Sequence, residues 1–341
     1  MRAWILEKFG EIRFGDFDVS DLSDGEILVR VKACGVCYRD IIDIQGGFKY
    51  TALPTVPGHE ICGVVEKVNG ETPFSRGDIV ISRHGAFCGR CELCLSGHDN
   101  ICLRGDKFVH TIPGGYADLV KAHFSAFELV PKDISEMLSP EQLSIVFCAV
   151  GTAYRAILTQ AEAKAGDTVL ITGASGGVGI HAIQISKSIG CFTIAVTTSD
   201  DKVEKIKKLG ADEVILSKDM RFNEQVSKIT DGRGVDIVIE NTGSIALESA
   251  LRSLRLTGTL VLVGNIRVDK YAMNPGMVIT REIKIKGTVG ISHNELQKLF
   301  NLLRERKVKP ILHSSIKLEE APKAHEILKD RRTFGRIALV P

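Results

Sequence analysis

The sequence predicts an α/β fold in which a doubly wound parallel sheet follows a smaller, mainly β domain. Three observations predict this class. From residue 167 onward, strand-like runs alternate with helix-like runs, which is the pattern of a parallel sheet covered by helices on both faces. A glycine-rich turn lies between the first of these strands and the helix that follows it. Before residue 150, short strand-like runs are broken by Gly and Pro, which is typical of a small barrel.

Length and composition exclude several classes of protein. The 341 residues are sufficient for two domains, and 44% hydrophobic with 25% charged residues is the content of an ordinary globular protein. A net charge of +2 argues against a dedicated binder of nucleic acid or of acidic surfaces. The apolar runs are too short to cross a membrane, and the N-terminus lacks the apolar core of a signal peptide. We therefore expect a cytoplasmic protein.

The strands of the first domain are read from their periodicity and their turns. Residues 25–33 carry apolar side chains at every second position after a turn glycine, with a half-exposed second face. We expect two further strands at residues 61–68 and 77–81, and residues 114–120 lead into another strand. A helix follows that carries Cys148, and we place the domain boundary near Gly151.

Four of the nine cysteines form one pattern in this domain. The pattern is C-x2-C-x2-C-x7-C, formed by Cys88, Cys91, Cys94 and Cys102. Four thiols in one short loop match a closed tetrahedral zinc site, with no ligand position left for chemistry. The alternatives are a partly oxidised surface loop and an iron–sulfur cluster. The remaining cysteines outside the ligand sets, Cys34, Cys62 and Cys191, are expected to be small buried residues.

The second domain follows the alternating pattern from strand to helix. The expected strands are 167–172, 192–196, 213–216, 235–240, 259–263 and 282–287, and the expected helices include 180–189 and 202–209. This alternation predicts a Rossmann domain. After it, residues 295–304 form an amphipathic helix.

The turn after the first Rossmann strand is a candidate phosphate cradle. Its residues are Gly173, Ala174, Ser175, Gly176, Gly177, Val178 and Gly179. Glycines there allow the backbone to approach a pyrophosphate at the N-terminus of the helix. Ala174 takes the place of the first glycine of the fingerprint, and Gly173 would supply the turn. The alternative is a tight turn that binds no nucleotide.

Three residues far apart in the chain form a candidate catalytic zinc set. Cys37, His59 and Cys148 supply two thiolates and an imidazole, which leave a fourth position for water or substrate. With Gly114-Gly115-Tyr116 and the four-cysteine loop, these residues give the chain a resemblance to the medium-chain, zinc-type alcohol dehydrogenase family over essentially its whole length. The run Cys37-Tyr38-Arg39-Asp40 also resembles a branch that includes archaeal acryloyl-CoA reductases.

The resemblance implies a domain plan and further site residues. Residues 1–150 would be a GroES-like catalytic domain with its zinc lobe at 88–102, residues 151–290 the Rossmann domain, and residues 291–341 a return to the first domain. Asp40 would orient the His59 ring, and Glu60 would be a spare ligand or a charge balance. The rest of the cofactor site would include Thr242, Val263, Gly264, Val289 and Arg336. The family forms oligomers, so we expect a homodimer or a homotetramer.

Alignment with the family also bears on the cofactor. NAD enzymes place Asp or Glu at the end of the second strand, where it binds the ribose 2′-hydroxyl. The corresponding position here is Thr197, followed by Thr198 and Ser199, with Lys202 nearby. A neutral residue does not repel a 2′-phosphate, so the sequence favours NADP(H) over NAD(H). Asp200 and Asp201 are the counter-argument; their other role is to cap the helix that follows.

Arg39 departs from the family pattern. The family has a Ser or Thr hydroxyl there that relays the proton of an alcohol substrate, and a guanidinium cannot release its proton at working pH. Either Arg39 turns away to pair with Glu60, Asp43 or a cofactor phosphate and zinc is bound, or the zinc site is weak or empty and Arg39 stabilises an oxyanion. A third alternative is a solvated surface arginine.

Three functions are compatible with these residues. The leading prediction is an NADP(H)-dependent oxidoreductase that acts on a carbonyl or alcohol. The second is an enoyl-thioester reductase, which needs no alcohol proton relay, and the third is a cofactor-binding protein without turnover. No role is assigned to the histidines other than His59, because their spacing is not that of metal ligands; these are His84, His98, His110, His123, His181, His293, His313 and His325.

Overall fold

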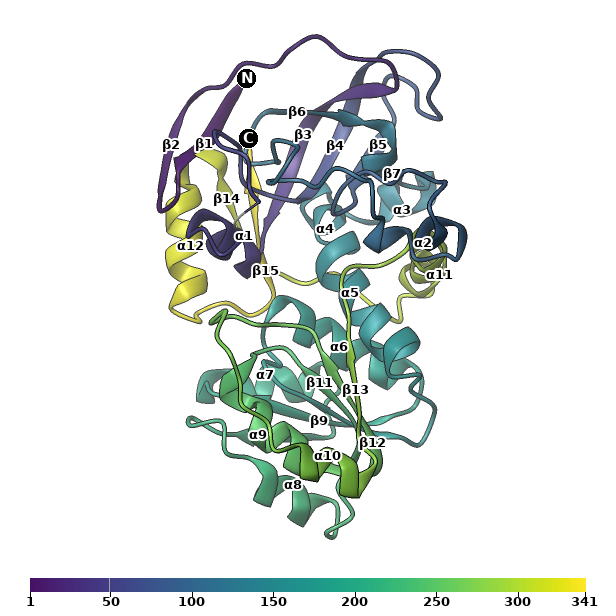
Figure 1. The fold of residues 1–341 in the computed structure, drawn as a ribbon, viewed down its shortest axis with the longest axis vertical. Coiled ribbons are helices and arrows are strands. Elements are labelled where there is room, and N and C mark those ends of the chain that lie inside the picture. The colour runs from purple at the N-terminus through teal and green to yellow at the C-terminus, as the bar shows by residue number, and fades with distance from the viewer. Residues whose placement is uncertain (49) are drawn as a thin grey trace. The chain divides into compact units, whose positions relative to one another are not determined.

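The computed structural model describes residues 1–48 and 50–341. They form two compact units (Figure 1). The first unit contains Met1–Gly151, Gly290–Arg304 and Pro310–Pro341, and the second contains Thr152–Val289 and Glu305–Lys309. All of residues 291–341 were expected to return to the first unit, but Glu305–Lys309 do not. That segment belongs to the second unit, where the Lys309 backbone N–H donates to Gln184 Oε1 at 2.9 Å and the Gln184 side-chain amide donates to Lys309 O at 3.1 Å.

The first unit is built on a seven-stranded sheet of order β14-β15-β3-β4-β5-β7, in which β6 also pairs with β3. A separate pair of strands, β1 and β2, is antiparallel. The bounds are β1 (Arg2–Lys8), β2 (Glu11–Asp16), β3 (Glu26–Val36), β4 (Glu60–Val68), β5 (Ile79–Ser82), β6 (Leu119–His123), β7 (Phe127–Leu129), β14 (Leu312–Lys317) and β15 (Arg336–Val340). In β3, Ile27, Val29 and Val31 are buried and Arg30 is exposed. The expected alternation of apolar and polar side chains in this strand therefore places one face of β3 in the core.

Short helices connect and cover these strands. They are α1 (Tyr38–Ile44), α2 (Glu92–Leu95), α3 (Lys132–Met137), α4 (Pro140–Ser144), α11 (His293–Arg304) and α12 (Ala321–Lys329). α4 begins at a capping box, in which Ser139 and Gln142 each bond the other's backbone N–H. The π-helical turn Val146–Val150 follows α4 and leads to α5 (Gly151–Tyr154) at the boundary between the units.

The second unit is a six-stranded parallel sheet of order β10-β9-β8-β11-β12-β13. Its strands are β8 (Thr168–Ile171), β9 (Phe192–Thr197), β10 (Glu213–Leu216), β11 (Val235–Glu240), β12 (Leu254–Leu262) and β13 (Lys284–Gly287). Its helices are α6 (Gly177–Ser188), α7 (Val203–Lys208), α8 (Asn223–Ile229), α9 (Ser244–Ser253) and α10 (Pro275–Arg281). In chain order this is 3-2-1-4-5-6, the doubly wound order of a Rossmann domain, so the expected fold class is confirmed.

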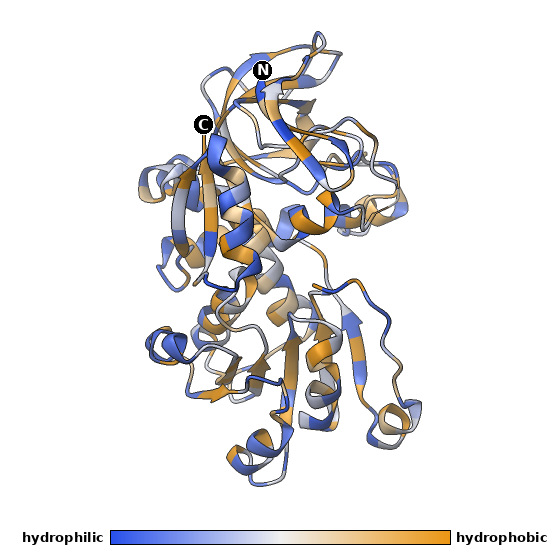
Figure 2. Ribbon diagram, turned by 90° about the vertical axis from the view of Figure 1, so that its left-hand side faces the viewer, coloured by the Kyte–Doolittle hydropathy of each residue, from blue (hydrophilic) through white to orange (hydrophobic). Residues whose placement is uncertain are grey.

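The sheet of the second unit is buried as its sequence predicts. All six residues of β11 are buried, as are five of the six in β9, and Figure 2 shows hydrophobic colour along the central strands. Parallel strands that are covered on both faces have continuous apolar sequences. The strands of this sheet could therefore be predicted from the sequence. Among the described residues, no helix is long and apolar enough to span a bilayer.

Candidate active site and metal centres

The four-cysteine loop brings its thiols together at one point. All four sulfurs of Cys88, Cys91, Cys94 and Cys102 lie within 4.8 Å of one another. The Cys91 sulfur is 3.5 Å from that of Cys94 and 3.9 Å from that of Cys102. Sulfurs bound tetrahedrally to one zinc ion lie about 3.8 Å apart, given Zn–S bonds of about 2.3 Å. The residues therefore fit a closed zinc site.

Backbone amides donate to two of these thiols, while burial and the Cys91 and Cys102 side chains raise the pKa of Cys94 to about 12. The N–H groups of Cys88 and Arg104 donate to the Cys102 sulfur at 3.3 and 3.4 Å. The backbone amide of Leu103 is the largest of the influences that lower the pKa of Cys91 to about 6. Thiolates held this way are the form that binds metal.

The second cluster joins Cys37, His59 and Cys148 with Glu60. One ligand atom from each lies within 4.8 Å of the others. Cys37 caps α1, His59 directly precedes β4, and Cys148 lies in the π-helical turn. The Cys148 sulfur is 3.6 Å from His59 Nε2, and tetrahedral zinc places such a pair about 3.6 Å apart. The three predicted ligands thus fit one zinc ion.

Asp40 holds the imidazole of this cluster in place. Its Oδ1 lies 3.0 Å from His59 Nδ1, and its Oδ2 accepts from the Cys37 backbone N–H at 2.8 Å and from the Tyr116 hydroxyl at 3.0 Å. Burial lowers the pKa of His59, but Asp40 and the Cys37 thiol together raise it to about 10. A carboxylate on Nδ1 turns Nε2 toward the sulfurs, the orientation that a metal-binding histidine needs.

Arg336 lies in this cluster, although the sequence analysis placed it among cofactor residues. Its guanidinium donates to Glu60 Oε1 at 2.6 Å and to the Cys37 sulfur at 3.3 Å. The cause is strand register: β15 runs antiparallel to β3 with Ile337 opposite Val36, so Arg336 reaches Cys37. Glu60 is therefore paired with a buried cation, while one of its oxygens also lies among the ligand atoms of the cluster, so both expected roles stay predictions. A contact between Arg336 and the cofactor stays a prediction.

Arg39 turns toward Asp43 and His110. Its Nε is 3.4 Å from Asp43 Oδ2, and its Nη2 is 2.7 Å from His110 Nε2. The guanidinium also lies 5.6 Å from the centre of the Phe48 ring, with a quarter of the side chain exposed. This arrangement corresponds to the first alternative of the sequence analysis, in which Arg39 pairs with a carboxylate.

The neighbours of Arg39 have displaced pKa values. Burial raises the pKa of Asp43 to about 6, against the opposing charge of Arg39. Burial and the Arg39 charge lower the pKa of His110 to about 4. His110 is therefore neutral near pH 7, and its Nε2 accepts from Arg39 while Nδ1 donates to the Thr51 hydroxyl at 2.8 Å.

The glycine-rich turn of the second unit is built for close approach of the backbone. It joins β8 to α6, with Gly176 as the N-cap of the helix. Gly173 has φ +56°, and a side chain at Gly179 would place its Cβ 2.3 Å from Gly173 O and 2.8 Å from Ala174 Cα. Gly177 and Val178 form the first turn of the helix, where N–H groups can bind a pyrophosphate.

The other predicted cofactor residues lie at one edge of the same sheet. They follow the carboxyl ends of parallel strands, which meet at the ligand-binding edge of such a fold. Thr197 ends β9 and precedes Thr198, Ser199 and Lys202, Thr242 follows β11, Val263 and Gly264 follow β12, and Val289 follows β13. Thr197 and Lys202 are buried, and no carboxylate ends β9.

Comparisons with known proteins match both units. Residues 23–132 match the family described as "Alcohol dehydrogenase GroES-like domain", and residues 177–305 match "Zinc-binding dehydrogenase". The chain belongs to the medium-chain, zinc-type alcohol dehydrogenase/reductase family. The recognition made from the sequence is thereby confirmed, and the protein is an oxidoreductase of a zinc-dependent, NAD(P)-binding family.

Relatives within this dehydrogenase/reductase family carry two kinds of name. An "Acryloyl-coenzyme A reductase" of Metallosphaera sedula is 32% identical over 95% of this chain and 96% of its own length. An "Alcohol dehydrogenase" of Geobacillus stearothermophilus is 35% identical over 92% of this chain and 91% of its own. The crystal structure of AibC is 38% identical, with a TM-score of 0.90 over 100% of this chain and 96% of that one.

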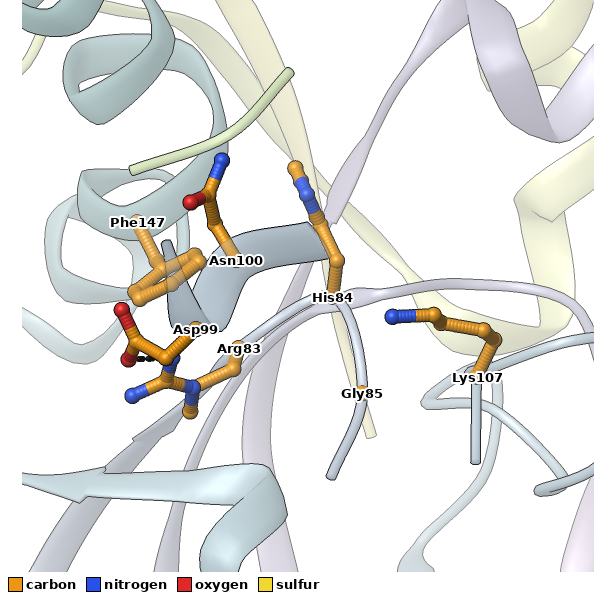
Figure 3. A pocket seen from close by; sticks show the side chains of 7 residues that line it. All are labelled: Arg83, His84, Gly85, Asp99, Asn100, Lys107 and Phe147. Carbon is orange, nitrogen blue, oxygen red and sulfur yellow. Dashed lines mark hydrogen bonds and ion pairs between the residues drawn. The ribbon is translucent and has the colours of Figure 1, made fainter. Parts of the chain in front are cut away.

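The structure adds residues that spacing did not reveal. His110 touches Arg39, and the His84 ring lies 5.4 Å from the His59 ring, centre to centre. His84 also lines a small pocket of the first unit, together with Lys107 and Phe147 (Figure 3). Their positions depend on packing between distant segments, so no signal in the sequence singled them out.

Proposed function

We propose that this dehydrogenase/reductase family member reduces the carbon–carbon double bond of an α,β-unsaturated thioester with NADPH. The observation that carries the proposal is Arg39. It stands where the family pattern has a relay hydroxyl, and in the structure it is fixed by Asp43 and His110. Alcohol oxidation needs a proton acceptor at that position and enoyl reduction does not. The name of the Metallosphaera relative supports the same assignment.

Reduction of an enoyl thioester needs a hydride and a proton, but no residue that relays the proton of an alcohol. NADPH supplies the hydride when it is bound, and a zinc ion held by Cys37, His59 and Cys148 would act as a Lewis acid. Hydride addition at the β-carbon moves the double-bond electrons onto the thioester oxygen. A proton from water then adds at the α-carbon, so the products are the saturated thioester, NADP⁺ and hydroxide, which the buffer neutralises.

The residues of the chain contribute orientation and charge. Asp40 fixes the His59 ring, and Glu60 with Arg336 balances the charge beside the thiols. Arg39 has five N–H donors, and those facing Asp43 and His110 leave others for an oxygen that becomes negative.

Interconversion of a carbonyl and an alcohol is the second candidate. It is favoured by the complete Cys37, His59 and Cys148 set and by the alcohol dehydrogenase relatives. The cofactor assignment to NADP(H) rests on the absence of a carboxylate at the end of β9. Assembly as a homodimer or homotetramer and a cytoplasmic location stay predictions.

A substrate panel tests the proposal. Purified protein is assayed with NADPH and with NADH against acryloyl-CoA, crotonyl-CoA, simple alcohols and bulky ketones. We expect NADPH-dependent reduction of the thioesters with kcat/KM at least about tenfold above that for any ketone, which corresponds to about 1.4 kcal/mol of transition-state binding. Turnover of alcohols and ketones alone would contradict the proposal in favour of the second candidate. Binding of cofactor with no turnover of any of them would support a protein whose chemistry has lapsed.

A further inference from the structure

Lys107 stands out because none of the described carboxylates forms an ion pair with it. Among residues 1–48 and 50–341, no carboxylate lies within ion-pair distance of its ammonium group, although the side chain is half-buried. Burial lowers the pKa of Lys107, and the charges of Arg39 and Arg83 lower it further, while the Cys102 and Cys94 thiols oppose this. The Cys102 thiol is the largest of these charge influences, and the ammonium still has no carboxylate as a hydrogen-bonded partner.

The neighbouring charges are already neutralised. Arg83 is paired with Asp99 and with Glu128, and Arg39 is paired with Asp43. Asp99, which lines the same pocket, also accepts from the His293 backbone N–H at 3.1 Å. The carboxylates near the pocket are therefore already engaged by other groups.

His84 is the second unsatisfied group of this pocket. Both of its ring nitrogens are buried and lack a hydrogen-bond partner among the described residues. The ring packs against His59 at 5.4 Å and Phe147 at 5.7 Å between centres. An imidazole ring carries at least one N–H donor in either protonation state, so His84 can donate to an acceptor that enters the pocket.

Backbone geometry sets these two residues side by side. A β-bridge pairs Gly85 with Lys107, and a Cβ at Gly85 would lie 2.0 Å from Asp106 O and 2.8 Å from Lys107 Cα. The absence of a side chain at Gly85 thus permits the close approach of the two segments. Figure 3 shows the Lys107 ammonium directed toward the His84 side of the pocket, with Arg83 and Asp99 joined opposite.

We propose that Lys107 and His84 form a carboxylate-binding subsite beside the Cys37, His59 and Cys148 cluster, so that the preferred substrate carries a carboxylate on its acyl chain. An ammonium and an imidazole N–H are two donors for one carboxylate, and the His59–His84 contact places the subsite next to the reacting group. This inference rests on the proposed function, because it names the class of thioester.

Two thioesters of similar length test the preference. Wild-type protein is assayed with NADPH on crotonyl-CoA, which is neutral at its acyl end, and on glutaconyl-CoA, which ends in a carboxylate. We expect kcat/KM to favour the carboxylate substrate by about tenfold or more, the worth of a charge-assisted hydrogen bond. Lys107→Met should reduce this ratio about tenfold, Lys107→Arg should retain most of it, and the exposed-lysine control Lys132→Met should leave it unchanged.

A binding measurement separates this inference from the proposed function. Calorimetric titration of glutarate into the protein with bound NADP⁺ should show binding that weakens about tenfold in Lys107→Met but not in Lys132→Met. If neither thioester is reduced but glutarate binds in this way, the proposed function fails and the subsite stands. No glutarate binding by the wild type, or an equal loss for both thioesters in Lys107→Met, overturns the subsite. Loss of zinc from Lys107→Met overturns it also, because Lys107 would then serve to balance the four-cysteine loop.

Discussion

Asp43 determines where Arg39 points. The carboxylate is fully buried, and its basic neighbours within 4 Å among the described residues are Arg39 and His110, with Asp40 and His59 also close by. Burial raises the pKa of Asp43 to about 6, and the charge of Arg39 is the largest influence that lowers it. Asp43 is therefore ionised near pH 7. Among the hydrogen bonds of the described residues, Arg39 contacts His110, whereas Arg336 donates to the sulfurs of Cys37 and Cys148. Arg39 is therefore compatible with a bound zinc ion.

A double-mutant cycle on this pair measures that commitment. We expect Arg39→Ser to lower the free energy of unfolding by about 2 kcal/mol, below the usual cost of breaking a buried pair because Arg39 is a quarter exposed. Asp43→Asn should cost less, and the double variant should cost less than the sum of the two. Urea unfolding gives the free energies, and metal analysis of Arg39→Ser should show the zinc content unchanged. Additive costs, or altered zinc content, would show that Arg39 interacts mainly with something other than Asp43.

His293 should make stability depend on pH. Its Nδ1 lies 2.8 Å from Glu128 Oε2, and this hydrogen bond raises the pKa of His293 against the effect of burial. Because the folded pKa lies above the unfolded value of about 6.5, the stabilisation is complete below pH 6.5 and is lost as pH rises through the folded pKa. The Tm difference between wild type and His293→Gln should thus be larger at pH 6 than at pH 9. In a Glu128→Gln background the pH dependence of that difference should vanish; its persistence there would rule out Glu128 as the cause.

At the scale of elements, β3 and the segments beside it assemble the catalytic cluster. Cys37 follows the last residue of β3, and β4 and β15, which flank β3, bring His59 and Arg336 to the same end. The π-helical turn after α4 supplies Cys148. The four-cysteine loop between β5 and β6 needs none of these strands to gather its sulfurs. The two metal centres should therefore respond separately to substitution.

Metal content of matched variants tests that separation. We expect two zinc ions per wild-type chain and one in each of Cys102→Ser and Cys148→Ser. Cys102→Ser should lower Tm, because a structural zinc contributes folding energy. Cys148→Ser should abolish activity with a smaller change in Tm. Elemental analysis with thermal unfolding checks both, and a wild-type content of one zinc would mean that the Cys37, His59 and Cys148 set is not a zinc site.

The sequence predicted the elements and clusters whose signals are local or strongly periodic. The four cysteines are close in the chain, and the alternation of β8, α6 and β9 is a periodic signal, so both were readable. The environment of Arg39 was not, because His110 lies 71 residues away and reaches it through loop packing. The contact of Arg336 with Cys37 and Glu60 was not predicted either, because it depends on the register of β15 on β3. Lys107 and His84 meet through a β-bridge that has no sequence signature.

At the scale of the whole molecule, the predicted cofactor residues other than Arg336 and the catalytic cluster belong to different compact units. The cradle at residues 173–179 and the end of β9 are in the second unit, and both predicted zinc sets are in the first. A cofactor that binds only the native state stabilises it by about 2.7 kcal/mol at a hundred times its Kd. Cofactor preference can therefore be measured by binding, without knowledge of the substrate.

A charge at the end of β9 should reverse that preference. Thr197 is buried there, and its hydroxyl accepts from the Ser199 backbone N–H at 3.2 Å, a bond that an aspartate can also accept. A carboxylate about 4 Å from a phosphate charge is repelled by about 4 kcal/mol per pair of unit charges at an effective dielectric near 20. Thr197→Asp should therefore weaken NADPH binding relative to NADH at least about tenfold, for which about 1.4 kcal/mol suffices. Thr197→Val removes the hydroxyl without adding charge and should keep the preference for NADPH. Fluorescence titration with both cofactors gives the ratio of Kd values. Tighter binding of NADH by the wild-type protein would show that a neutral end of β9 does not select the 2′-phosphate here.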